Sequence, residues 1–350
     1  MRFDFHTTSM SPEVLGDAAA ELEHGGFDSI WTAETNHDPF VGLALASART
    51  ERVRLATGLA VAFARNPMST AMIANDLQLV AKGRFTLGLG TQKQNHITRR
   101  FSMPWSAPAD RMREYVLAVR QIWHCFGTGE RLRFRGEFYR HTVLNPFFDP
   151  GPNPYGPPPI LLAGVGPRLI EVAGEVADGF LGHVLTTPEY LRNVVRPILA
   201  DSRAEAGKTL DDFDIHLTPI VVTGTDEVSF GKAADAARAS IAFYATVPGY
   251  QVALESCGLG DLHAELLRVA GAGRLEDLPA VIDDATLDIL GIVGTPAEVA
   301  RKFYDRFEGL ASSVAFFDNS GDDLAPQLEL NAALRTEQAR RPDKSAVNAK

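Results

Sequence analysis

The sequence alternates between short apolar runs and longer amphipathic segments over most of its length. Strand-like composition occurs in residues 2–7, 29–34, 54–63, 85–90, 160–165, 179–184, 213–222 and 312–318. Helical periodicity follows most of these runs, in residues 11–24, 38–50, 67–82, 167–177, 188–207 and 229–246. Strands that alternate with helices form parallel sheets, and eight such units close into a barrel. The pattern therefore predicts an α/β fold, the (β/α)8 or TIM barrel.

A first insertion is expected after the fourth strand, over residues of about 91–159. It contains an amphipathic segment from Arg111 to Phe126, a hairpin pattern at 132–141 and a Pro/Gly-rich segment at 146–159. The aromatic residues of the Pro/Gly-rich segment favour packing on the barrel over a flexible linker.

A second insertion is expected after the seventh strand, over residues of about 247–311, where the pattern is mostly helical. We see no internal repeat and no linker composition between the insertions and the barrel. The sequence therefore predicts one domain over residues 1–325, followed by a C-terminal helix and tail over 326–350.

Composition and charge exclude several classes of protein. The chain has 350 residues, 45% of them hydrophobic, and a formal net charge of -10. An acidic chain is a poor partner for nucleic acid, because phosphate binding needs clustered Lys and Arg. No apolar run approaches the roughly 20 residues of a membrane helix. With only Cys125 and Cys257 and no signal-peptide pattern, we expect a cytoplasmic protein without disulfides.

Ionisable residues follow the second strand directly. Glu34, Asn36, His37 and Asp38 end the run that begins at 29, and Pro39 then opens a helix. Asp38 is interpreted as the helix cap, with Pro39 in the first helical position. His37 could exchange a proton near neutral pH, and Glu34 could orient it or a cofactor. The alternative is that His37 is merely solvated.

Other strand ends are polar as well, which predicts a site at the barrel mouth. The residues concerned are His6, Thr7 and Thr8 after strand one, Arg65 and Asn66 after strand three, Thr91 and Gln92 after strand four, and His183 after strand six. The histidines lack the spacing of a zinc motif, and no G-x-S-x-G nucleophile elbow occurs. Cofactor or proton-transfer chemistry is therefore favoured.

A turn after the fifth strand has the composition of an anion site. Gly164, Val165, Gly166, Pro167 and Arg168 join this strand to a helix, whose free N–H groups and dipole favour an anion. The alternative is a tight turn that simply needs glycine. The run Gly88-Leu89-Gly90-Thr91 is neither a dinucleotide fingerprint nor a P-loop.

The combination of SIWTAETNHDPF, RLATGLAVAFARNPMSTA, KGRFTLGLGTQ, FRGEFYR, PPPILLAGVGPRLIEVAGEVADGF and IVGTPAEVARKF resembles the luciferase-like monooxygenase superfamily. More narrowly, the chain resembles its coenzyme F-420-dependent branch, over residues of about 1–320. The resemblance implies a (β/α)8 barrel and hydride transfer through a flavin-type ring in the barrel mouth.

The resemblance also implies roles for individual residues. A non-prolyl cis peptide in a bulge of strand three is expected at Gly58–Leu59, with Ala60–Val61 as the alternative. Glu34 matches the acid after strand two, and His37 the proton-donating histidine, although the spacing differs by a residue or two and leaves Asn36 as the alternative. The remaining cofactor contacts are expected from Thr91 to Asn95 for the ribityl chain, Gly164 to Arg168 for the phosphate, and His183 in the pocket.

The sequence leaves the substrate open. The aromatic residues Phe63, Trp105, Phe147, Phe148 and Tyr155 either line a substrate pocket or pack the first insertion onto the barrel.

Three functional hypotheses follow. The first is an oxidoreductase that uses coenzyme F-420, an 8-hydroxy-5-deazaflavin, to act on a small organic molecule. The second is a monooxygenase that uses reduced FMN and oxygen, and the third is a barrel that binds a flavin without turnover. The family resemblance also implies a homodimer through the second and third helices. Charge and the absence of long apolar runs predict no nucleic-acid or membrane partner.

Overall fold

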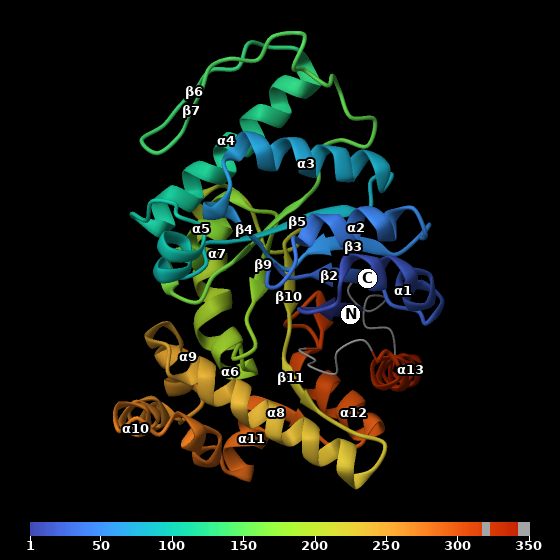
Figure 1. Ribbon diagram of the computed structural model, residues 1–350, viewed down its shortest axis with the longest axis vertical. Helices are drawn as coiled ribbons and strands as arrows, with labels where there is room; N and C mark the ends of the chain where they lie inside the picture. The colour runs from blue at the N-terminus through green and yellow to red at the C-terminus, as the bar shows by residue number, and fades with distance from the viewer. Residues whose placement is uncertain (317–322, 342–350) are drawn as a thin grey trace.

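The centre of the computed structural model is a closed parallel barrel (Figure 1), and the structure describes residues 1–316 and 323–341. Its eight strands are β1 (Arg2–Thr7), β2 (Ser29–Thr32), β3 (Arg54–Thr57), β5 (Phe85–Gly90), β8 (Ile160–Ala163), β9 (Gly179–Gly182), β10 (Asp214–Leu217) and β13 (Ser313–Ala315). Neighbours in the sheet pair in the order β3-β2-β1-β13-β10-β9-β8-β5, and pairing between β3 and β5 closes the ring. The predicted (β/α)8 barrel is confirmed.

Helices follow the strands and cover the outside of the barrel (Figure 1). They are α1 (Pro12–His24), α2 (Pro39–Ser47), α3 (Pro67–Val80), α4 (Pro108–Thr128), α5 (Pro167–Val176), α7 (Arg196–Glu205), α12 (Pro296–Phe307) and α13 (Ala325–Arg340). Ser11, Asp38 and Asn66 cap the first three, each accepting a hydrogen bond from a backbone N–H of the first turn. A proline in the first turn completes each of these starts, as the sequence predicts.

The first insertion contains the predicted helix, α4, and the predicted hairpin, β6 (Phe134–Arg135) with β7 (Arg140–His141). A π-helical turn, η2 (His96–Arg100), precedes α4. The expectation that the Pro/Gly-rich segment packs its aromatic residues on the barrel is wrong for two of them. Phe147 is 87% and Phe148 62% exposed, and their rings pack edge to face on each other instead of on the barrel. Tyr155, in contrast, lies against Gly83 after α3.

The apolar run 213–222 is not one strand, which corrects the sequence interpretation. It divides into β10 in the barrel and β11 (Ile220–Val222), which pairs in parallel with β12 (Gly291–Val293) in a separate small sheet. Pro219 lies between the two strands, and proline cannot donate a ladder hydrogen bond. The strand β12 falls within a stretch that the sequence indicates as mostly helical.

The second insertion lies between β11 and β12 and forms the lower part of the molecule in Figure 1. The predicted bounds, 247–311, are therefore wrong, because the helix at 229–246 belongs to the insertion and β12 ends it. It contains α8 (Glu227–Ala245), η4 (Pro248–Tyr250), α9 (Gln251–Ser256), α10 (Gly260–Gly271), η5 (Leu275–Val281) and α11 (Asp284–Leu290). These elements share an apolar cluster of their own, which includes Ile220, Ile241, Leu254 and Leu266. Two short elements, α6 (Pro188–Tyr190) and η3 (Leu191–Val195), join β9 to α7.

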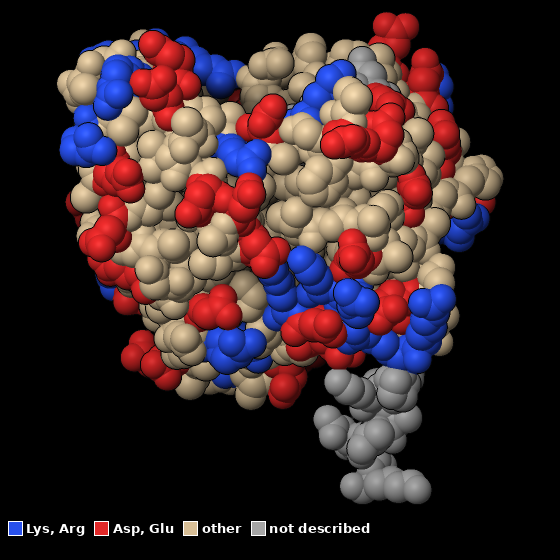
Figure 2. Space-filling view, turned by 90° about the horizontal axis from the view of Figure 1, so that it is seen from below, with Lys and Arg blue, Asp and Glu red and all other residues tan. Residues whose placement is uncertain are grey.

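The charged surface is mixed. On the face that Figure 2 shows, acidic and basic side chains lie next to one another. Among the described residues, no helix has both the length and the apolar character required to span a membrane. The predicted C-terminal helix is α13, whereas the end of the predicted tail, residues 342–350, lies outside the described residues. The single domain over 1–325 stays a prediction.

Candidate active site

The third barrel strand carries a β-bulge. Between the pairs Ala56–Thr86 and Ala60–Leu89, this strand advances four residues while β5 advances three. One extra residue therefore separates β3 from its continuation, β4 (Ala60–Val61). The peptide bond between Gly58 and Leu59 within the bulge is cis, at the first of the two positions that the family resemblance implies.

Hydrogen bonds from neighbouring strands hold this bulge. The Nε2 atom of His6 lies 2.7 Å from the carbonyl oxygen of Gly58, and the backbone N–H of Glu34 donates to the carbonyl of Leu59 over 3.0 Å. The N–H of Val61 donates to the Glu34 carboxylate over 2.7 Å. His6 and Glu34 thus fix both sides of the bulge.

Two glycines of β5 allow the bulge to approach closely. A Cβ atom on Gly88 would lie 1.9 Å from the Thr57 carbonyl oxygen, and one on Gly90 would lie 2.6 Å from a methyl group of Leu59. The repeated glycines in this strand therefore serve packing against the bulge.

Glu34 is almost fully buried, at 8% exposure, and forms an ion pair with Arg65. The same guanidinium reaches Asp38 over 2.6 Å and lies over the ring of Phe40. Burial disfavours the charge of Arg65, but its hydrogen bonds and charge attraction to Glu34 and Asp38 raise its pKa overall. Glu34 is therefore placed to orient the bulge and Arg65. Asp38 is the predicted helix cap and also completes this ion-pair network.

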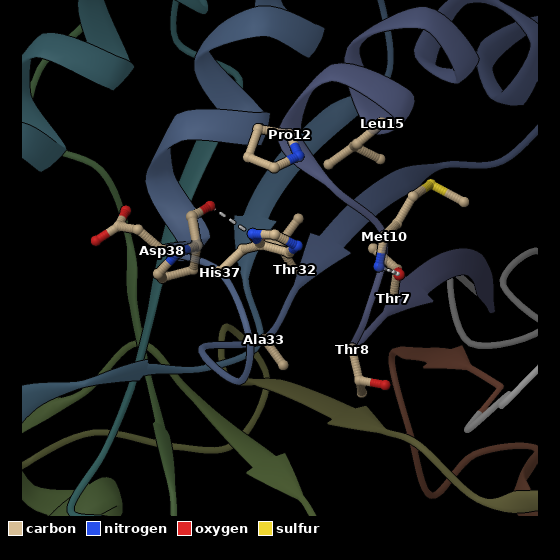
Figure 3. Close-up of a pocket in the computed structure, with 11 residues that line it drawn as sticks. Thr7, Thr8, Met10, Pro12, Leu15, Thr32, Ala33, His37 and Asp38 are labelled. Atoms are coloured by element: carbon tan, nitrogen blue, oxygen red, sulfur yellow. Dashed lines mark hydrogen bonds between the residues drawn. The ribbon is translucent and has the colours of Figure 1, made fainter. Parts of the chain in front are cut away.

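His37 and Asn36 are both exposed. His37 borders a small cavity of about 20 Å³ between the first turns of α1 and α2, where Pro12 and Leu15 lie opposite it (Figure 3). Among the described residues, no hydrogen bond joins His37 to Glu34. The two residues of the predicted acid–base pair therefore point to different places. The Glu34 carboxylate faces the bulge, and His37 faces the cavity between α1 and α2.

His183 lies at the end of β9, where the sequence predicts a pocket residue. Its ring packs against Tyr244 at 4.4 Å and Tyr250 at 4.9 Å between ring centroids. Burial, together with the positive charge of Lys93 and a smaller effect of His6, lowers the pKa of His183 to about 3. The imidazole is therefore neutral at physiological pH. Sequence reasoning missed both tyrosines, since no pattern marks an inserted segment as part of the mouth.

The turn 164–168, where the sequence predicts an anion site, leads into the N-terminus of α5. Within the described part of the chain, the N–H groups of Val165 and Gly166 have no acceptor, and Gly166 caps α5 without a side chain. Tyr190 donates its hydroxyl to the Val165 carbonyl over 2.6 Å and fixes the turn. The Arg168 guanidinium is 69% exposed and pairs with Glu171 and Asp110, so its charge is partly neutralised.

The strand-four loop begins at Thr91, whose hydroxyl donates to the carbonyl of Gln92 over 3.1 Å. Thr91 is half-buried and Asn95 is exposed. Lys93, between them, is half-buried and lies over the ring of Phe243 from α8. The loop and the second insertion therefore meet at the mouth.

A polar cluster inside the barrel was not predicted. Asp4 and His216 are buried, with 3.2 Å between a carboxylate oxygen and Nδ1, and Trp31 stacks on the His216 ring at 4.0 Å. His6, two residues beyond Asp4 on β1, has its pKa lowered to about 4 by burial, against the effect of its bond to Gly58. Alternating residues of β1 thus place polar groups in the barrel interior.

Among the predicted aromatic pocket residues, Phe63 is buried and packs edge to face on Trp105. The Arg111 guanidinium lies over the Phe63 ring, 4.6 Å from its centroid. These two rings join the first insertion to the barrel. Among the described residues, no group of three or more His, Cys, Asp or Glu could hold a metal ion.

Comparison with known proteins defines the class. Residues 2–313 match the luciferase-like monooxygenases. An uncharacterized protein of Mycobacterium tuberculosis is 46% identical over 298 residues, covering 85% of this chain and 88% of that protein. A putative coenzyme F-420-dependent oxidoreductase of the same organism is 30% identical over 315 residues, covering 83% and 86%.

Solved structures with this fold include enzymes of both flavin types. The coenzyme F-420-dependent tetrahydromethanopterin reductase from Methanopyrus kandleri has a TM-score of 0.79 at 19% identity, with 96% of this chain and 99% of that chain covered. The oxygenating constituent of 3,6-diketocamphane monooxygenase from Pseudomonas putida, in complex with FMN, has a TM-score of 0.66 at 16% identity, with 97% and 99% covered.

Fold, mouth and relatives together define a barrel enzyme of the oxidoreductase or monooxygenase class. The chain belongs to the luciferase-like monooxygenase family.

Proposed function

We propose that this protein is an oxidoreductase that transfers a hydride between coenzyme F-420 and a small organic substrate. The observation that carries the proposal is the turn at Val165 and Gly166, whose free N–H groups fit the phosphate of such a cofactor. The relatives at 30% identity with an assigned cofactor support the deazaflavin, since they are named as F-420-dependent.

The other cofactor contacts belong to the same proposal. Gly58 and Leu59 back the ring from the bulge, Thr91 and Asn95 line the ribityl chain, Gly164 to Arg168 surround the phosphate, and His183 limits the pocket. When bound, the deazaflavin supplies a carbon that accepts or gives a hydride. The protein fixes the bulge through Glu34 and His6, and keeps His183 neutral beside the ring site.

His37 is the proposed proton carrier, and the proposed role of Glu34 is to hold the bulge and Arg65 in position. The lowered pKa values of His6 and His183, about 4 and about 3, leave both uncharged and poor proton donors near pH 7. His37 is exposed and can exchange protons with solvent. Asn36, beside it, would then contact the cofactor.

A pair of variants at Gly166 tests the phosphate turn. A Cβ atom there meets no atom within 4 Å, and Asp is a favourable helix cap, so both Gly166→Asp and Gly166→Ala are expected to fold. The aspartate places a negative charge at the N–H groups. We expect it to weaken coenzyme F-420 binding about tenfold or more, whereas alanine changes the dissociation constant less than about twofold. Equal affinities of the two variants would contradict the assignment of the turn.

The alternative is an FMN-dependent monooxygenase, which the same turn would serve. The fold similarity to an FMN-bound monooxygenase supports this alternative.

A homodimer is also proposed, because the outer faces of α2 and α3 expose Val41, Leu45, Met72, Leu79 and Val80. Light scattering that gives 38.0 kDa, the mass of a single chain, would contradict the dimer.

A further inference from the structure

Lys93 is a half-buried cation at the end of β5 without an anionic partner among the described residues. Its Nζ lies 4.9 Å from the centroid of the Phe243 ring, and burial lowers its pKa. Arg65 and Arg168 at the mouth differ from Lys93, because each of them pairs with two carboxylates. A partly buried charge costs free energy unless it is paired. A bound anion would remove that cost.

An aromatic ring and a histidine lie near Lys93. Lys93 lies close enough to His183 that its charge lowers the pKa of that imidazole. The buried Nδ1 of His183 has no hydrogen-bond partner within the described residues. The Phe243 ring beside Lys93 is 58% exposed, whereas Tyr250 is buried behind His183. One cation, one unsatisfied imidazole nitrogen and one exposed aromatic ring suit a ligand with one anionic end and a planar or apolar body.

We propose that Lys93 receives an oxyanion of the substrate, a carboxylate or a phosphate, while Phe243 contacts the apolar part of the same molecule. This assignment rests on the proposed function, in which Val165 and Gly166 hold the cofactor phosphate and leave Lys93 to the second molecule. The substrate class is therefore a small anionic compound.

Calorimetric binding to the F-420-loaded protein tests this assignment with benzoate, phenyl phosphate and benzamide as probes. We expect at least one of the two anions to bind about tenfold or more tightly than the neutral amide, because a charge-assisted hydrogen bond contributes that much. Lys93→Met should abolish the preference and Lys93→Arg should retain most of it. Lys208→Met, an exposed lysine between α7 and β10, is the matched control and should behave as the wild type.

Three results would overturn the assignment. The first is that neither anion binds better than benzamide, and the second is that Lys93→Met keeps the preference. In the third, Lys93→Met weakens coenzyme F-420 about tenfold but spares its phosphate-free deazaflavin chromophore, so that Lys93 serves the cofactor tail. If F-420 does not bind the wild type, the proposed function fails separately, and the same probes applied to the protein alone still test Lys93.

Discussion

At the scale of single residues, Glu34 shows how position decides chemical role. Its carboxylate is committed to the N–H of Val61 and to Arg65, so it is placed to fix the bulge rather than to exchange protons with solvent. The sequence places this acid directly after the second strand, and the structure brings it to the bulge of the third strand. The sequence contains no signal for Arg65 as the partner of Glu34, because the two residues follow different strands and lie far apart in the chain.

His37 is the residue whose replacement tests proton transfer. His37→Ala should lower kcat about 100-fold, since general acid–base catalysis typically contributes that much or more, while the cofactor dissociation constant changes less than about twofold. Steady-state kinetics with parallel fluorescence titration separate the two effects. His24→Ala, at the exposed end of α1, is the control. Unchanged kcat in His37→Ala would assign the proton to another group or to water.

At the scale of elements, the bulge depends on the glycines of β5. Gly88→Ala would place a methyl group 1.9 Å from the Thr57 carbonyl, which backbone movement must relieve. We expect the free energy of unfolding to fall by about 3 kcal/mol, the upper range for overpacking, as measured by urea denaturation.

Gly127 in α4 gives the matched control, because a Cβ atom there meets nothing within 4 Å. Gly127→Ala should stabilise the protein by about 0.5–1 kcal/mol through helix propensity. If Gly88→Ala is as stable as Gly127→Ala, the close approach of the bulge to β5 is wrong.

Most elements could be predicted from the sequence, and the exceptions have physical reasons. Hydrophobic periodicity and the Ser11, Asp38 and Asn66 caps locate the barrel strands and the first helices, because both are local signals. The division at Pro219 was missed since the apolar run continues across it. The contact of Lys93 with Phe243 joins two insertions far apart in sequence, so no local pattern could reveal it.

At the scale of the whole molecule, two buried histidines link stability to pH. The pKa of His6 falls from 6.5 to about 4 and that of His183 to about 3 on folding. Between these values and pH 6.5 the unfolded chain binds protons that the folded chain does not. The free energy of unfolding is therefore unaffected by these two groups above pH 6.5. It decreases as the pH falls from 6.5 toward 4, because protons then bind to the unfolded chain.

Denaturation curves between pH 7 and pH 4.5 measure this effect. His6 alone should lower the free energy of unfolding by up to about 1.4 kcal/mol per pH unit within its window. His6→Asn should flatten the slope, whatever its effect on stability at pH 7. An identical slope in wild type and variant would mean that His6 is not buried in its neutral form.

The central claim concerns the cofactor, and a paired titration of the purified protein tests it most directly. Coenzyme F-420 and FMN are added separately, and ligand fluorescence is followed to saturation. We predict saturable quenching of F-420, with a dissociation constant at least about tenfold lower than that of FMN. Tight binding of FMN with no response to F-420 would contradict the deazaflavin assignment and favour the FMN-dependent monooxygenase.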